Sequence, residues 1–309
     1  ELDGTITYVG GAGVDTVTGG AKNDTIDGGV GADVITGGKG LDTLTGGTLA
    51  DQFVYTDPNQ SNSSGADTIT DFVTGTDKLV VTLDLSARTN AQTVDATINV
   101  AAAGTAAVQS GLSGSVGQAT YDTTNSQVII NGNADNLVTT LDYVINVGAV
   151  ATAANSIVEG DINYVITGGS GADTITSGGG ADTVTTGGGG GTVILGDGAD
   201  ILTVAGGVDI VKYVGTTAAL IAAEAGTTAG TDNDFASGTV GDQVTTWVSA
   251  TDKIYFPAAL LTNAIGTEAD TLVVVGAGGT VTNAARFVEM TASSDGTMGD
   301  MITDLNTLT

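Results

Sequence analysis

The chain has 309 residues and a formal net charge of −28, because its 35 acidic residues outnumber seven Lys and Arg. It contains no Cys and no His, which excludes disulfides, thiolate nucleophiles, Ser-His-Asp triads and metal sites built on sulfur or imidazole. So acidic a chain is not expected to bind nucleic acid. No apolar run reaches about 18 residues, so we expect no insertion into a membrane as a helix.

The composition favours β-structure made of short strands. Gly supplies 49 residues and aromatic residues only 4% of the chain, while Thr, Val and Ile are abundant. β-Branched residues favour strands, and glycine favours the tight turns between them. We therefore expect an all-β protein, and the 41% of apolar residues exclude disorder of the chain as a whole.

A nine-residue repeat begins at Gly10 and reads GGAGVDTVT, GGAKNDTID, GGVGADVIT, GGKGLDTLT and GGTLADQFV. An aspartate recurs every nine residues, at Asp15, Asp24, Asp33, Asp42 and Asp51. An apolar residue follows two positions after each aspartate, at Val17, Ile26, Ile35, Leu44 and Phe53. Each nonapeptide therefore predicts a Gly-rich turn followed by a three-residue strand that buries one side chain, so several strands must stack before they form a core.

The chain between the first repeat block and a second one lacks this period. The segment from Phe53 to Val81 follows the first block, and we expect an irregular β region at 82–165. Within that region, the patterns favour strands at Gln127–Ile130 and at 141–147. We therefore expect a first domain at 1–81 and a separate β region after it.

The second block begins at Gly168 and reads GGSGADTIT, SGGGADTVT, TGGGGGTVI, LGDGADILT and VAGGVDIVK. Its aspartates keep the same phase, at Asp173, Asp182, Asp200 and Asp209. Gly191 stands where the period would place a further aspartate, and the apolar positions are Ile175, Val184, Val193, Leu202 and Val211. We expect a second repeat domain at 166–213 and a second β region, which includes a strand at 271–275, within 214–309.

Stacking these repeats would align one aspartate per turn in a ladder of like charges. Such a ladder repels itself unless cations lie between its carboxylates. Carboxylates and backbone carbonyls, with no nitrogen or sulfur ligand, form a hard oxygen site, and calcium suits such a site because it takes 6–8 oxygens in flexible geometry. The alternative is a flexible Gly/Asp-rich tract without metal, but ten phased apolar positions favour a folded stack.

The nonapeptides resemble the RTX family, whose pattern is G-G-x-G-x-D-x-U-x. The resemblance implies two parallel β-rolls in which two nonapeptides form one coil and Ca²⁺ lies between turns two repeats apart. It implies carboxylate pairs Asp15/Asp33, Asp24/Asp42, Asp33/Asp51 and Asp182/Asp200, with fewer ions in the second roll because of Gly191. The implied metal-binding residues are Gly10, Asp15, Gly19, Asp24, Gly28, Gly31, Asp33, Gly37, Gly40, Asp42, Asp51, Asp67, Asp71, Asp77, Gly168, Gly171, Asp173, Asp182, Asp200 and Asp209.

The segments after the two blocks resemble the stretch that closes RTX rolls in secreted proteases and surface-layer proteins. Aligning them places Asp67 with Asp242, Phe72 with Trp247, and Asp77-Lys78 with Asp252-Lys253. Two interpretations of the first segment stay open. Asp67, Asp71 and Asp77 add a calcium site, or they cap turns and pair with Lys78. In the second segment Thr246 replaces Asp71.

We found no pattern of catalytic residues, so we expect no enzymatic activity. The resemblance implies an extracellular calcium-binding protein that is secreted by a type I pathway and self-assembles into a surface layer or filament. We expect contacts at Leu2–Val9 and at the tail Met298–Leu308, with a cell-surface polysaccharide as a further partner. One alternative is the C-terminal secretion module of a larger RTX enzyme, toxin or adhesin, in which both ends join other domains. Another is an adhesin segment that binds sugars or ice.

Overall fold

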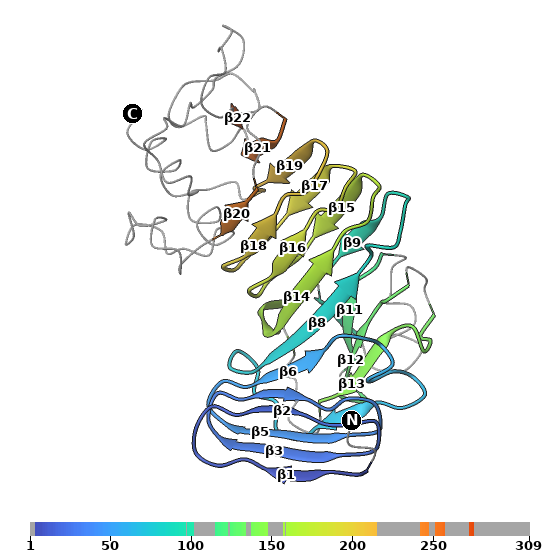
Figure 1. The fold of residues 1–309 in the computed structure, drawn as a ribbon, viewed down its shortest axis with the longest axis vertical. Coiled ribbons are helices and arrows are strands. Elements are labelled where there is room, and N and C mark those ends of the chain that lie inside the picture. Colours follow the sequence, from blue (N-terminus) through green and yellow to red (C-terminus); the bar gives the residue numbers. More distant parts are fainter. Residues whose placement is uncertain are drawn as a thin grey trace, which may run out of the picture. The chain divides into compact units, whose positions relative to one another are not determined.

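The computed structural model describes residues 4–96, 98–101, 115–122, 124–133, 137–147, 157, 159–214, 242–246, 251–256 and 272–274 (Figure 1). Across these residues the protein is an all-β structure, as predicted, and its one helical element is a short 3-10 turn, η2 (Glu159–Asp161). None of the described helices is long and apolar enough to cross a membrane. The chain divides into two compact units, formed by residues 1–83 with 94–165 and by residues 84–93 with 166–309.

The first repeat block folds into two parallel stacks of short strands. One stack contains β1 (Thr7–Val9), β3 (Thr25–Val30), β5 (Thr43–Thr48) and β7 (Asp67–Ile69). The other contains β2 (Thr16–Thr18), β4 (Val34–Thr36), β6 (Gln52–Tyr55) and β8 (Lys78–Asp84). Ile26 lies opposite Leu44, and Ile35 lies opposite Phe53, so paired positions are two repeats apart. One coil therefore uses two nonapeptides, which is the predicted parallel β-roll.

The apolar residue of each repeat forms the core of this roll. Ile26, Ile35, Leu44 and Phe53 are fully buried, and Val17 near the first coil is nearly so. Strand β2 shows this pattern, because two exposed threonines flank its one buried side chain, Val17. Because one coil supplies only two buried side chains, the core exists only through stacking, and each removed side chain would cost about 1.5–3 kcal/mol of burial.

A non-repetitive sheet continues the first unit beyond the roll. Strand β7 pairs in parallel with β13 (Tyr143–Asn146), which pairs antiparallel with β12 (Gln127–Ile130). Strands β11 (Ala119–Asp122) and β10 (Ile98–Ala101) complete that sheet. The predicted strands at 127–130 and 141–147 are confirmed. The region expected as a separate domain at 82–165 is instead divided: 94–165 packs with the first roll, and 84–93 packs in the second unit.

The second block repeats the arrangement of two parallel stacks. The first stack is β15 (Asp173–Thr176), β17 (Gly191–Ile194), β19 (Asp209–Lys212) and β21 (Lys253–Phe256), closed by antiparallel β22 (Leu272–Val274). The second stack is β16 (Thr183–Thr185), β18 (Ile201–Thr203) and β20 (Gln243–Thr245). Strand β14 (Ile162–Thr167) carries the chain into this unit, and β9 (Thr93–Asp95) lies at the unit boundary. Trp247 and the tail at 298–308 lie outside the described residues, as do residues 1–3.

Candidate metal centre

The repeat aspartates of the first roll form two ladders, and backbone hydrogen bonds link successive aspartates within each ladder. The carboxylates of Asp33, Asp42 and Asp51 each accept a hydrogen bond from the backbone N–H of the aspartate 18 residues earlier. The N–H to Oδ1 distances are 2.8 Å for Asp15 to Asp33, 2.7 Å for Asp24 to Asp42 and 2.9 Å for Asp33 to Asp51. The structure thus brings together the three predicted pairs, on two edges of the roll.

The second carboxylate oxygen of the inner ladder residues has no protein partner. Asp33 Oδ2 and Asp42 Oδ2 are buried and make no hydrogen bond. A Cβ added at Gly28 would lie 2.5 Å from Asp33 Oδ2 and 2.8 Å from the Gly46 carbonyl oxygen. A carboxylate and a carbonyl oxygen therefore converge on a point that only glycine leaves free. Buried oxygens without a donor are costly, and a cation between them removes that cost.

At the other predicted turn glycines, an added Cβ would likewise collide with a nearby atom. A Cβ at Gly37 would lie 2.5 Å from Asp42 Oδ2, and one at Gly40 would lie 2.6 Å from the Lys22 carbonyl oxygen. In every remaining case a Cβ would overlap a backbone atom of the neighbouring coil or segment, and this holds for Gly10, Gly19, Gly31, Gly168 and Gly171. Leu49 replaces glycine in one turn, yet it keeps a positive φ of 86°, at a conformational cost. Substituting Gly28 or Gly37 would close the space in which the oxygens converge, and substituting Gly171 would instead push against the backbone of Asn90 and Ala91.

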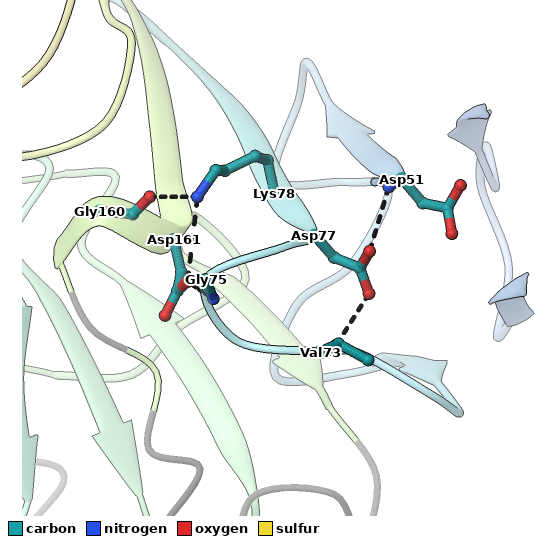
Figure 2. Close-up of polar contacts among 7 residues, drawn as sticks. All are labelled: Asp51, Val73, Gly75, Asp77, Lys78, Gly160 and Asp161. Carbon is teal, nitrogen blue, oxygen red and sulfur yellow. Dashed lines mark hydrogen bonds and ion pairs between the residues drawn. The ribbon is translucent and has the colours of Figure 1, made fainter. Parts of the chain in front are cut away.

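The segment Phe53–Val81, which follows the first block and which we call the cap segment, extends both ladders by one residue each. Asp42 donates its N–H to Asp67 Oδ1 over 2.9 Å, and Asp51 donates its N–H to Asp77 Oδ1 over 3.1 Å. Figure 2 shows the second of these bonds, together with the Val73 N–H that donates to Asp77 Oδ2 over 2.8 Å. Asp67 and Asp77 therefore lie on different edges, and the cap aspartates do not gather in one site of their own.

Asp71 and Lys78 have specific partners that the sequence left open. Both oxygens of Asp71 accept backbone hydrogen bonds, from Gly46 N–H at 2.9 Å and Gly47 N–H at 2.8 Å. Asp71 thus caps the turn that precedes Asp51, which supports the capping interpretation for this residue. The Lys78 ammonium lies 4.0 Å from Asp161 Oδ1, a partner that sequence reasoning missed because no pattern distinguishes Asp161 from other scattered acids.

The second roll contains equivalent ladders, and the segment that follows the second block extends each of them by one aspartate. Asp182 donates its N–H to Asp200 Oδ1 over 2.8 Å, as the predicted pair requires. Asp200 in turn donates to Asp242 Oδ1 over 3.1 Å, and Asp209 donates to Asp252 Oδ1 over 3.2 Å. The two cap aspartates, which only the alignment of the two halves singled out, hold the positions that Asp67 and Asp77 hold in the first roll.

Gly191 interrupts one ladder of the second roll, because it supplies no carboxylate at its position. It lies opposite Asp173 on one side and Asp209 on the other. Both oxygens of Asp173 accept backbone hydrogen bonds, because Gln92 N–H donates to Oδ1 over 2.9 Å and Gly169 N–H donates to Oδ2 over 2.8 Å. Both oxygens of Asp209 are buried without a hydrogen bond. On this edge, among Asp173, Asp209 and Asp252, the carboxylate whose two oxygens are both buried without a hydrogen bond is therefore that of Asp209.

Burial makes the charged state of the ladders unfavourable in the absence of a cation. It raises the pKa of Asp51 to about 6, and the nearby carboxylates of Asp77, Asp33 and Asp71 contribute. Burial raises the pKa of Asp67 to about 8, although the hydrogen bond from Asp42 opposes that rise. Burial also raises the pKa of Asp200, as do its two neighbours on the ladder. A divalent cation reverses this preference and stabilises the carboxylates.

The donor set fits calcium. The described residues contain no group of three or more His, Cys, Asp or Glu side chains that would hold a metal by themselves. Each centre must therefore combine paired carboxylates with backbone carbonyl oxygens such as that of Gly46. An all-oxygen, flexible set of this kind suits calcium better than magnesium, which demands near-octahedral geometry.

Comparison with known proteins agrees with this donor set. A family model for the RTX calcium-binding nonapeptide repeat matches residues 9–48 and 165–193, in four copies. The first matched stretch contains the ladder residues from Asp15 to Asp42, and the second contains Asp173 and Asp182. No curated protein matches the chain. The repeats, the roll and the matched family model together show that both blocks contain RTX calcium-binding nonapeptide repeats.

Proposed function

We propose that the chain is an extracellular, non-catalytic structural protein that folds on secretion, when it meets external calcium, and then assembles with copies of itself. The observation that supports the folding step is the set of buried, unpartnered carboxylate oxygens at Asp33, Asp42 and Asp209. Extracellular calcium modules bind with Kd of about 10⁻⁴–10⁻³ M, so cytosolic calcium is too low to load them. RTX repeat proteins are typically secreted by type I systems, which supports an extracellular location.

Self-assembly is the specific part of this proposal. A charge of −28 keeps calcium-free copies apart, and calcium lowers that repulsion while it makes the rolls rigid. Among the described strands, β1 has β3 as its one neighbour, so its outer edge offers unpaired backbone groups. Val9 and Val14 near this edge are 69% and 74% exposed. A head-to-tail contact at such an edge propagates into filaments or sheets.

The proposal excludes catalysis and names other copies of the chain as its main partner. The chain lacks His and Cys, and the buried repeat acids form ladders of hydrogen bonds instead of an acid/base pair in a cleft. We expect no binding of nucleic acid, because the chain is strongly acidic, and no direct insertion into a membrane. A cell-surface polysaccharide, bridged through calcium, is the proposed attachment point of the assembly.

Light scattering and negative-stain microscopy, with and without millimolar calcium, test the proposal. We expect monomers in chelator and ordered filaments or sheets in calcium. The matched control is the double variant Val9→Asp with Val14→Asp, which adds charge at the exposed edge and replaces no ladder residue. This variant should fold in calcium but not assemble. A chain that folds in calcium yet stays monomeric at high concentration would favour the secretion-module alternative.

A further inference from the structure

The last pair on one ladder of the first roll depends on a short turn in the cap. Asp77 belongs to the turn Val73–Asp77, and its carboxylate lies beside Asp51. Val73 N–H donates to Asp77 Oδ2 over 2.8 Å, and Asp77 N–H donates to the Val73 carbonyl over 2.9 Å. The direction of the Asp77 carboxylate is therefore set by the geometry of this turn.

Residues from a distant part of the chain hold this turn in place. Asp161 Oδ1 accepts the Gly75 N–H over 2.5 Å, across 86 residues of sequence. Lys78, the residue after the turn, donates from Nζ to the Gly160 carbonyl over 2.5 Å and lies 4.0 Å from Asp161 Oδ1. Figure 2 shows Asp161 and Gly160 on one side of the turn and the Asp77 carboxylate on the other, near Asp51.

We propose that Asp161 is a positioning residue for a calcium ion held between Asp51 and Asp77. Asp161 is fully buried, so its contact to Gly75 is shielded from water and holds the centre of the turn firmly. Contacts of this kind around metal ligands keep the ligands oriented, and losing one weakens metal affinity by roughly 10–100-fold. The proposal rests on calcium as the ion of the ladders and does not depend on self-assembly.

The second roll provides the internal comparison. Its Asp252-Lys253 pair holds the place of Asp77-Lys78, since Asp209 N–H donates to Asp252 as Asp51 N–H donates to Asp77. Lys253 is exposed, whereas Lys78 is half-buried. Within the described ranges, Lys78–Asp161 is the one ion pair, so Lys253 has no counterpart of Asp161 there. Within the part of the chain that the structure describes, the two rolls thus close their ladders alike, and an ion pair at the closing lysine is found in the first roll alone.

A double-mutant cycle on the full chain tests the proposal. Equilibrium dialysis measures the calcium stoichiometry and affinity of the native chain, of Asp161→Ala, of Asp77→Asn and of the double variant. We expect Asp161→Ala to weaken one calcium by roughly tenfold or more while the other sites keep their affinity. In the Asp77→Asn background the same substitution should have no further effect on affinity, because Asp161 acts through Asp77.

Two controls separate positioning from general stability. Asp142 is also fully buried and accepts backbone bonds from Gly132 and Thr139, but it lies outside the ladders. Asp142→Asn should lower the melting temperature and leave every calcium affinity unchanged, and Lys253→Gln should change neither. Equal affinities for the native chain and Asp161→Ala would overturn the proposal, and so would an undiminished Asp161→Ala effect in the Asp77→Asn background.

A third variant keeps the test decisive if Asp161→Ala does not fold in calcium. Lys78→Gln removes the ammonium beside Asp161 but retains a side chain that can donate to Gly160. It should weaken the same calcium ion, and again only when Asp77 is intact. A folded Lys78→Gln chain with native calcium affinity would then refute the positioning role.

Discussion

Asp33 is the ladder residue whose loss should cost the most calcium-dependent stability. It takes part in two pairs, because it accepts the Asp15 N–H at Oδ1 and donates its own N–H to Asp51. Its Oδ2 is buried with no hydrogen bond, so it is available to a cation. Asp33→Asn keeps the shape and an acceptor for Asp15 but removes the charge from both centres.

The expected magnitude follows from mass action. With Kd of about 10⁻⁴–10⁻³ M and calcium at about 10 mM, each site stabilises the fold by about 1.4–2.7 kcal/mol. Asp33→Asn weakens two sites and should lower the free energy of unfolding by about 3–5 kcal/mol in calcium. Asp15→Asn affects one predicted pair and should cost about half as much. Without calcium, Asp33→Asn should be neutral or stabilising, because it removes a buried charge that nothing neutralises.

Urea unfolding followed by circular dichroism, in calcium and after calcium removal, measures these differences. The calcium concentration at half-folding provides a second measure if the calcium-free chain is unfolded in buffer. Asp27→Asn is the matched control, since Asp27 lies half-buried on β3 outside the ladder and should change neither quantity. An equal loss of stability with and without calcium would refute the reasoning, because the role of Asp33 would then be purely structural.

The pKa shifts and the capping contact give two further predictions. The pKa values of Asp51 and Asp67 are raised to about 6 and about 8, so the metal-free fold binds more protons than the unfolded chain. Its stability should be greatest near pH 4 and fall as the pH rises through 6 and 8, as circular dichroism of calcium-free protein would show, and a loss of structure on acidification from pH 8 to 5 would contradict this. Calcium affinity should rise over the same window. Asp71→Ala should destabilise the first roll by about 1–3 kcal/mol, because it leaves the N–H of buried Gly46 without an acceptor, whereas water can replace the acceptor of the exposed Gly47 N–H. Terbium luminescence should show unchanged metal stoichiometry for that variant, and the loss of one ion would instead make Asp71 a ligand.

The periodic part of the molecule could be predicted from sequence because each repeat follows one physical rule. An aspartate every nine residues and an apolar residue two positions later were sufficient to place Asp33, Ile35 and their partners in the roll. The alignment of the two halves also predicted that Asp242 and Asp252 are equivalent to Asp67 and Asp77 of the first roll. The repeat pattern predicted these residues because neighbouring coils are equivalent.

The non-periodic part could not be predicted in the same way. Nothing in the sequence around residues 84–93 indicates that this segment packs in the second unit, where Gln92 N–H binds Asp173. Asp161 likewise resembles any isolated acid until its contact with Gly75 is seen. Both depend on contacts between residues about 80 positions apart, and a single sequence carries no periodic signal for such pairs.

The chain alternates between the two units, because residues 84–93 belong to the second unit and residues 94–165 belong to the first. A single proteolytic nick between Val94 and Val165 would leave one fragment with most of the first unit and a piece of the second. The other fragment would hold the rest of both. Neither unit could then be released without breaking its own internal packing, such as the bond between Ser170 N–H and the Arg88 carbonyl. An exposed protein with this connectivity tolerates a cut in its backbone without shedding either half.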